Sequence, residues 1–151
     1  MSAAPFERGR DGYTCSDDPA RLDLDLIHGF LKTSYWAGAR SRETQVRANA
    51  GSLCFGLYAA DGSQVGFARV VSDYASFAYL ADVFVLEAHR GRGLADWLMQ
   101  GIHAHPRLQG LRRWSLATRD AHGLYARHGW APVARPEIWM EKFDDRTDGP
   151  S

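Results

Sequence analysis

The sequence has few of the features that mark secreted, metal-binding or membrane proteins. Its 151 residues include two cysteines, Cys15 and Cys54, which lie far apart and outside any CxxC pattern. Neither a disulfide framework nor a metal site is therefore expected. The formal net charge is zero, so no overall attraction to nucleic acid or to an anionic membrane is expected. No apolar run is long enough to span a bilayer, and the first fifteen residues lack a signal-peptide core. These absences favour a cytoplasmic protein.

The composition that remains is that of one globular domain, with 45% hydrophobic and 24% charged residues. The polar ends predict a flexible N-terminus over residues 1–15 and a flexible tail over 144–151, with the domain at 16–143. Charge is unevenly distributed, because eight arginines and two acids lie between Ala88 and Pro136. That half of the chain could attract a polyphosphate, although exposed helix faces would carry arginine in any case.

In the first half, the apolar pattern predicts two helices followed by three strands. Asp18-Pro19 is a helix-start signal for a helix to about Lys32, and Ser41 can cap a second helix to about Asn49. Asp61-Gly62 is a strong hairpin turn. Strands are expected at residues 53–58, 64–71 and 76–86.

In the second half, a helix is expected from Leu94 to about His105, where Pro106 ends it. A strand is expected over Trp114–Ala117, then a short helix capped by Asp120 and closed by His128-Gly129. Residues 132–143 are expected to form two short strands or a bent one. This order predicts a single mixed α/β or α+β domain, and the chain has neither the Rossmann glycine fingerprint nor a P-loop.

The segment Arg90–Ala95 is the most informative part of the sequence, because it joins an apolar strand to an amphipathic helix. Gly91 and Gly93 let the backbone approach a ligand closely, and the N–H groups at the helix start carry the positive end of the helix dipole. An anion such as a pyrophosphate fits there. The alternative is an ordinary loop whose arginines are solvated.

Two motifs decide between these interpretations. Residues 82–95 resemble the acyl-CoA-binding motif of the GNAT N-acetyltransferase superfamily, [Q/R]xxGx[G/A]. Arg90 stands at its first position, Gly93 at the glycine and Ala95 at the last position. Residues 120–130 resemble the late helix of the same family, which ends in Leu-Tyr, three residues, Gly and an aromatic residue. The two motifs stand in the correct order, separated by one helix and one strand, and together are more specific than either alone.

The resemblance implies a single-domain GNAT-like fold from about Asp18 to Phe143. Its sheet is mixed and mostly antiparallel, with helices on both faces and a V-shaped splay between the family's strands four and five. Acetyl-CoA, the co-substrate, would lie in that splay, with its pantetheine arm on the fourth strand and its pyrophosphate on the glycine loop. No metal is implied. The implied cofactor-binding residues are Val83, Phe84, Val85, Arg90, Gly91, Arg92, Gly93, Leu94, Ala95 and Thr118, the last replacing an Asn common in the family.

The resemblance also implies roles in catalysis. Tyr125 stands where the family's tyrosine acts as general acid toward the CoA sulfur, and the alternative is a tyrosine packed in the core. Asp82 would take the proton of the amine, directly or through water, and the alternative is a solvent-facing strand residue. The backbone N–H of Val85 would polarise the carbonyl. Tyr35 and Trp36 would help form the acceptor pocket, or pack in the core.

The sequence therefore predicts an N-acetyltransferase that moves an acetyl group from acetyl-CoA to a primary amine. The acceptor would be a small molecule or amino-acid-like compound, with direct transfer in a ternary complex, and Arg40 or Arg42 could pair an acceptor carboxylate. The alternatives are a protein or peptide amine acetyltransferase and a non-catalytic acyl-CoA-binding module. A nucleic-acid contact by the Arg-Gly loop is disfavoured by the zero net charge. The acceptor, the acyl chain length and the oligomeric state, a homodimer included, stay open.

Overall fold

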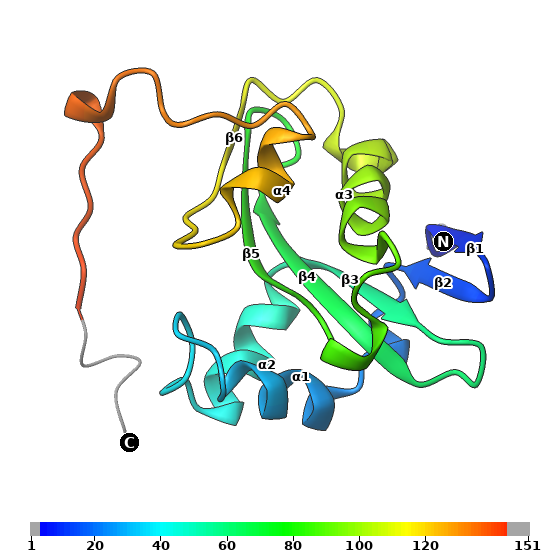
Figure 1. Cartoon of the computed structure of the whole chain (residues 1–151). Helices are drawn as coiled ribbons and strands as arrows, with labels where there is room; N and C mark the ends of the chain where they lie inside the picture. The colour runs from blue at the N-terminus through cyan, green and yellow to red at the C-terminus, as the bar shows by residue number, and fades with distance from the viewer. Residues whose placement is uncertain (1–3, 145–151) are drawn as a thin grey trace.

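The computed structural model of the chain describes residues 4–144. Six strands form one mixed sheet in chain order, and all neighbours are antiparallel except the last pair, which is parallel (Figure 1). The strands are β1 (Glu7–Arg10), β2 (Tyr13–Ser16), β3 (Leu53–Tyr58), β4 (Gln64–Ser72), β5 (Phe77–Val85) and β6 (Arg113–Ser115).

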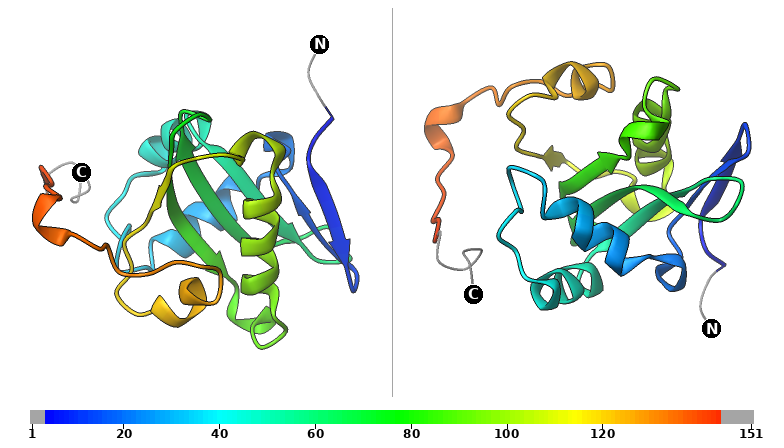
Figure 2. Two further views of the ribbon diagram at one scale, coloured as in Figure 1. Left: turned by 90° about the horizontal axis from the view of Figure 1, so that it is seen from above. Right: turned by 60° about the horizontal axis from the view of Figure 1, so that its bottom comes forward.

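Helices cover both faces of the sheet, as Figure 2 shows. On one face lie α1 (Leu24–Leu31) and α2 (Arg42–Ala50), and on the other lie α3 (Leu94–Ala104) and α4 (His122–Ala126). The described part of the chain also has four single 3-10 turns: Pro19–Arg21, Glu87–His89, Pro106–Leu108 and Pro136–Ile138. The architecture expected from the sequence, a mixed and mostly antiparallel sheet between helices, is confirmed.

The sheet buries apolar side chains on each face. The larger cluster lies under α3, whose residues Leu94, Leu98, Met99 and Ile102 recur at helical spacing and are at most 3% exposed. The smaller cluster lies under α1, where the Phe30 ring stacks on Phe84 with centroids 4.0 Å apart. Each such side chain contributes about 1.5–3 kcal/mol to the free energy of folding through its burial.

Local signals in the sequence explain most of the helix and strand bounds. The Ser41 hydroxyl accepts from the Thr44 N–H at 3.1 Å and caps α2, as expected. The turn at Asp61-Gly62 joins β3 to β4, with Gly62 at φ +87°. The first expected helix is divided in two. Asp18 caps only the 3-10 turn Pro19–Arg21, and Asp23, two residues after that turn, caps α1.

The flexible N-terminus expected over residues 1–15 is wrong for the part that the structure describes. Strands β1 and β2 form a hairpin that adds to the edge of β3, and its turn places Asp11 and Gly12 at positive φ. The Phe6 N–H donates to Asp17, and the second carboxylate oxygen of Asp17 lies 2.8 Å from His105 Nε2. The outer strand has polar, partly exposed residues, which in sequence are hard to distinguish from a loop.

The strands expected over residues 132–143 are also wrong. Residues 131–144 are exposed, and the structure shows one 3-10 turn at Pro136–Ile138 and no strand there. Pro136 has no N–H for a sheet hydrogen bond, and the residues after it pair with no strand among residues 4–144. The expected tail lies outside the described residues, apart from Asp144.

No helix among residues 4–144 has the length and apolar character needed to cross a membrane. No group of three or more His, Cys, Asp or Glu side chains among residues 4–144 is arranged to hold a metal ion.

Candidate active site

The parallel strands β5 and β6 separate to form a V-shaped opening. They pair at three positions only, from Phe77 opposite Arg113 to Tyr79 opposite Ser115. Beyond that point β5 continues to Val85, while the chain after β6 turns toward α4. A cavity of about 500 Å³, here called the acceptor cavity, opens in the splay, a volume typical of small-molecule sites. Its walls come from residues 79–83 and 116–121 with Tyr35, Trp36, Arg40, Arg69 and Tyr125.

A β-bulge in β5 turns Asp82 toward this cavity. Phe67 pairs with Phe84 and Arg69 pairs with Ala81, so Asp82 and Val83 together stand opposite one residue of β4. Asp82 has φ +56°, a conformation that costs a non-glycine residue about 1–2 kcal/mol. Without the bulge, alternation would place Asp82 on the α3 face. The bulge places it on the α1 and α2 face, where its partners lie.

The Asp82 carboxylate is the buried centre of a polar network. It is 3% exposed and pairs with Arg40 and Arg69, each at 2.9 Å. Gln45 Nε2 and Trp36 Nε1 also donate to it, at 3.2 and 3.0 Å. Burial acts to raise the pKa of Asp82, but the charges of Arg69 and Arg40 outweigh burial and hold the pKa below its usual range. The alternative of a solvent-facing strand residue is wrong.

Tyr125 reaches the same cavity from α4. Its ring belongs to the α3 cluster and is 9% exposed, while the residue also lines the acceptor cavity. Burial raises the pKa of the Tyr125 phenol to about 12, with further contributions from Tyr35 and Asp120. The phenol therefore keeps its proton at any physiological pH. The ring is packed in the core, and the residue still faces the opening where the family's motif places it.

The cap expected from Asp120 on α4 is wrong, because no side chain caps this helix. The Thr118 hydroxyl accepts from the N–H of Ala121, the residue before the helix, at 3.1 Å. Thr118 also lines the acceptor cavity. Its suggested contact with the cofactor arm stays a prediction.

The aromatic residues Tyr35 and Trp36 form the rim of the acceptor cavity and are not core residues, being 45% and 37% exposed. The Tyr35 hydroxyl accepts from the Arg119 N–H at 2.8 Å, and the Arg119 guanidinium lies 3.8 Å from the Tyr35 ring centroid. The loop after α1 is thereby joined to the loop after β6. Arg42 pairs with Asp25 instead and does not line the cavity.

The glycine loop has the backbone geometry of an anion site. Gly91 and Gly93 have φ of +79° and +73°, and Gly93 begins α3 with no side chain capping the helix. The first N–H groups of α3 thus have no capping partner from a side chain, a fit for a phosphate. A cavity of about 260 Å³ lies against this loop and is lined by Val85, His89, Arg90, Gly91, Gly93, Leu94, Ala95 and Asp96.

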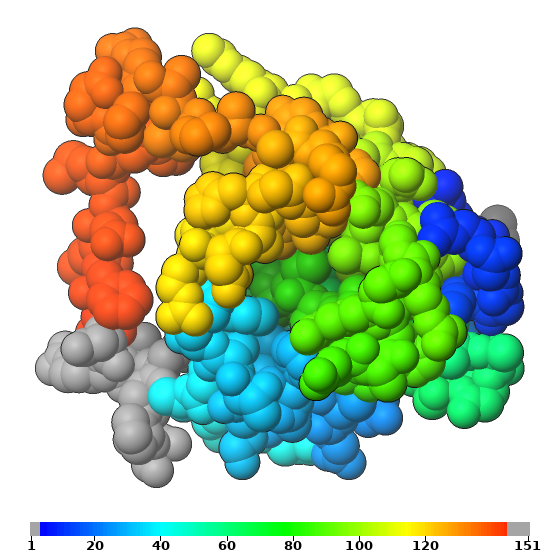
Figure 3. Space-filling view, in the orientation of Figure 1, coloured from blue at the N-terminus to red at the C-terminus, as the bar shows by residue number. Residues whose placement is uncertain are grey.

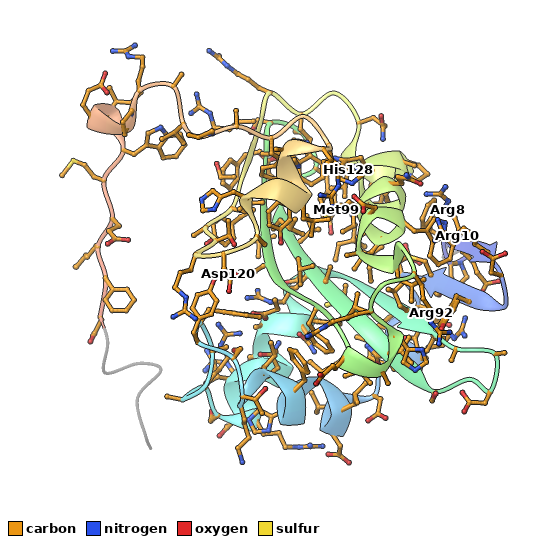
Figure 4. The ribbon with its side chains drawn as sticks, viewed as in Figure 1. Arg8, Arg10, Arg92, Met99, Asp120 and His128 are labelled. Atoms are coloured by element: carbon orange, nitrogen blue, oxygen red, sulfur yellow. The ribbon has the colours of Figure 1, made fainter. Side chains whose placement is uncertain are left out.

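The arginines of the loop make structural contacts that the sequence did not indicate. Arg90 Nε donates to the Val85 carbonyl at 2.9 Å, which ties the loop to the end of β5. Arg92 Nη1 donates to the Tyr13 hydroxyl, and the Arg92 carbonyl accepts from Arg10 Nη2 at 3.0 Å. Figure 4 shows Arg10 on the β1–β2 hairpin beside Arg92. Arg10 was not predicted as a site residue, and the Asp11-Gly12 turn is the signal in the sequence that could have indicated the hairpin that carries it.

The remaining expected cofactor residues lie on β5. Phe84 packs in the α1 cluster, so its side chain lies on the face away from the α3 cluster. Val83 lines the acceptor cavity and Val85 lines the loop cavity. Residues two apart on a strand are about 6.7 Å apart. The two cavities therefore lie close to each other along β5, an arrangement that suits an elongated ligand.

The family model of the GNAT acetyltransferase domain matches residues 51–132, more than half of the chain. The chain belongs to this family and is an acetyltransferase. A protein of the fungus Gibberella zeae described as a putative acetyltransferase is 33% identical over 79% of this chain and 78% of its own length.

Two further relatives show how far the similarity extends. The crystal structure of a GNAT-family protein from Xanthomonas campestris pv. campestris, described as a putative acetyltransferase, has 52% identity and a TM-score of 0.86. That match covers 90% of this chain and 96% of the other. The mycothiol acetyltransferase of an Arthrobacter species is 28% identical over 84% of this chain. The chain spans only 43% of that enzyme's length. The substrate of the mycothiol enzyme is therefore not assigned to this chain.

Proposed function

We propose that this protein transfers an acetyl group from acetyl-CoA to a primary amine of a small or amino-acid-like acceptor. Transfer would be direct, with both substrates bound together. One observation carries the proposal: the uncapped glycine loop and the cavity containing Tyr125 lie close to each other along β5. This arrangement suits a long donor whose anionic end and reactive end lie apart.

The residues present fit acetyl-CoA, the acetyl donor of the family. The N–H groups of Leu94, Ala95 and Asp96 would hold its pyrophosphate, in the positive field of Arg10, Arg90 and Arg92. Val83 and Val85 would border the pantetheine arm. When bound, this donor supplies a thioester, which an amine cleaves with formation of an amide and release of a thiol.

Tyr125 is positioned to stabilise the departing sulfur. A thiol has a pKa of about 8.5, below the value of about 12 for the buried phenol. The phenol is therefore the weaker acid, and it stabilises the thiolate as a hydrogen-bond donor without giving up its proton. Proximity of the two bound substrates contributes a further part of the rate.

Asp82 fits a positioning role better than proton abstraction. Four side chains already donate to its two oxygens, and its lowered pKa makes it a weak base. Asp82 holds Arg40, Arg69 and Trp36 in the wall of the acceptor cavity. The proton of the amine would pass to water in the acceptor cavity.

The lining of the acceptor cavity favours a small acceptor with an apolar or aromatic part and an acidic group. Tyr35, Trp36 and Tyr79 offer ring faces, while Arg40 and Arg69 place cationic groups in the wall. A volume of about 500 Å³ suits an amino acid or a compound of similar size. The alternative acceptor is an amine of a protein or peptide, and a screen of small amines, amino acids and peptides distinguishes the two classes.

A thermal-shift titration tests the choice of donor. Saturation at 100 times the dissociation constant stabilises a protein by about 2.7 kcal/mol, which for this size raises Tm by about 5–10 °C. We expect that rise with acetyl-CoA and with CoA, and no rise with acetate alone. A folded protein whose Tm does not respond to acetyl-CoA would contradict the proposal.

Replacing Gly93 by valine is expected to weaken acetyl-CoA binding at least about tenfold, because the substitution disturbs the loop that presents the helix N–H groups. Gly93 has φ +73°, and an added Cβ would lie 3.3 Å from Arg10 Nη2. The matched control is Gly110→Val, whose φ is +74° with nothing within 4 Å of the added Cβ. Calorimetric titration should show weaker binding for the first variant only. Equal affinities in the two variants would exclude the loop as the phosphate site.

A further inference from the structure

The acceptor cavity has two walls that carry opposite charge. Figure 3 shows this face of the molecule hollowed between the light-blue atoms of the loop after α1 and the yellow atoms of the loop after β6. One wall holds Arg69 with its buried partner Asp82, and the other holds Asp120 near Tyr125. What each wall can bind decides how an acceptor lies in the cavity.

Arg69 keeps one nitrogen for a ligand. Its Nε donates to Asp82 at 2.9 Å and its Nη1 donates to the Ser52 hydroxyl at 3.2 Å. Within residues 4–144 no acceptor is found for Nη2, although the side chain is only 12% exposed and lines the acceptor cavity. Asp82 also pairs with Arg40, so its charge is shared between two guanidiniums. An N–H of a guanidinium at a cavity wall fits an anionic oxygen, such as that of a carboxylate.

Asp120 offers the opposite charge on the other wall. It is exposed on the loop before α4, where Figure 4 labels it, and it lines the acceptor cavity. Its carboxylate makes no hydrogen bond or ion pair with another described residue, and the neighbouring Arg119 packs on the Tyr35 ring instead. The charge of Asp120 contributes to the raised pKa of the Tyr125 phenol, so the carboxylate is near enough to act on that group. An ammonium bound at Asp120 would therefore lie near the phenol proposed to stabilise the departing sulfur.

Two aromatic rings connect the charged walls. Trp36 Nε1 donates to Asp82 at 3.0 Å at one end. At the other end the Tyr35 hydroxyl accepts from the N–H of Arg119, the residue before Asp120, at 2.8 Å. The two rings pack edge to face with centroids 5.1 Å apart, and both residues line the acceptor cavity. An apolar or aromatic stem can therefore lie along these rings, between the guanidinium and the carboxylate.

We propose that the acceptor carries its amine and an acidic group at opposite ends of an apolar or aromatic stem. The acidic group pairs with Arg69, the stem lies on Trp36 and Tyr35, and the amine lies at Asp120. The amine arrives as an ammonium and gives one proton to water before its nitrogen can form the amide bond, while Asp120 accepts a hydrogen bond from a remaining N–H. This inference rests on the proposed function. It separates the acceptor from an α-amino acid, whose two charged groups share one carbon.

Calorimetric titration of the full chain, saturated with CoA so that no transfer occurs, tests this geometry with three compounds of similar size. The first, para-(aminomethyl)benzoate, has its amine and carboxylate at opposite ends of a ring. Phenylglycine has both groups on one carbon, and benzylamine lacks the carboxylate. We expect the first compound to bind at least about tenfold more tightly than the other two, the effect of one more charge-assisted hydrogen bond. Similar affinities for the three, or no binding of the first, would overturn the inference.

Two variants assign the ends of the acceptor. Asp120→Asn should weaken the binding of para-(aminomethyl)benzoate and of benzylamine severalfold, whereas Arg69→Lys should weaken only the binding of para-(aminomethyl)benzoate. The matched control is Glu43→Gln, at an exposed carboxylate on α2 outside the acceptor cavity, which should bind as the wild type does. Arg69 belongs to the Asp82 network, so if its variant does not fold, the two compounds compared on the wild type report the same contact. Unchanged affinities in Asp120→Asn would contradict its role.

Thiol release from acetyl-CoA with the same compounds separates this inference from the proposed function. We expect the highest kcat/KM with para-(aminomethyl)benzoate, and we expect Asp120→Asn to raise its KM severalfold with little change in kcat. Selective binding of this compound without thiol release would contradict acetyl transfer to it and keep the binding geometry. Acetylation of all three compounds with equal kcat/KM would keep the proposed function and overturn the geometry.

Discussion

Replacing Asp82 by alanine is expected to lower the free energy of unfolding by about 3–5 kcal/mol, a large part of the stability of a domain. The substitution leaves Arg40 and Arg69, whose side chains are 13% and 12% exposed, without the carboxylate that both contact. Urea unfolding followed by circular dichroism measures the loss. If the alanine variant does not fold, Asp82→Asn keeps the shape of the side chain and should show a smaller loss.

The control for this substitution is Asp25→Ala. Asp25 also pairs with an arginine, Arg42, but both side chains are exposed, so its loss should cost less than about 1 kcal/mol. Equal losses at the two positions would contradict the account of a buried network.

The contribution of Asp82 should also depend on pH. Because its pKa in the folded protein lies below the unfolded value of about 3.9, the stabilisation is present above that value and is lost as the pH falls through the folded pKa. The stability difference between wild type and Asp82→Asn should therefore be constant near neutral pH and shrink in acid. If the stability difference instead grew in acid, the lowered pKa of Asp82 in the folded protein would be contradicted.

Replacing Tyr125 by phenylalanine is expected to lower kcat by about 10²-fold, the usual cost of one hydrogen-bond donor at a centre where negative charge develops. KM for acetyl-CoA should change little, because the lost hydrogen bond forms only as the sulfur departs. With a pKa of about 12, the phenol stays neutral, so Tyr125 should cause no fall in rate between pH 7 and about pH 10.

Steady-state kinetics with Tyr74→Phe as control checks this assignment. Tyr74 lies outside the acceptor cavity, where its ring contacts the Arg107 guanidinium, and its variant should keep full activity. Full turnover in Tyr125→Phe would remove the tyrosine from the mechanism.

Much of the fold was predictable because its signals are local. The Ser41 cap, the Asp61-Gly62 turn and the apolar spacing of α3 each act over a few residues. The β1–β2 hairpin and residues 132–143 were predicted wrongly for opposite reasons. A short polar strand at a sheet edge resembles a loop, whereas residues 132–143 include apolar residues typical of a strand but form none in the structure.

The parts of the site that depend on local motifs were also predictable, whereas its long-range contacts were not. Motif spacing singled out Tyr125 and the two glycines of the loop, and the structure shows Tyr125 at the cavity and Gly91 and Gly93 at positive φ. It could not indicate that Asp82 pairs with Arg40, 42 residues away, because that contact depends on a bulge and on the packing of α2. The contact of Arg10 with the loop, across 82 residues, was hidden in the same way.

The most direct test of the central claim measures thiol release from acetyl-CoA in the presence of small primary amines, amino acids and peptides. The account predicts release that requires both the enzyme and an acceptor, is fastest with a small acceptor, and falls about 10²-fold in Tyr125→Phe while acetyl-CoA still binds. Tight acetyl-CoA binding with no release across a broad panel would contradict catalysis and indicate a binding module. Release only with peptides would contradict the small-molecule acceptor.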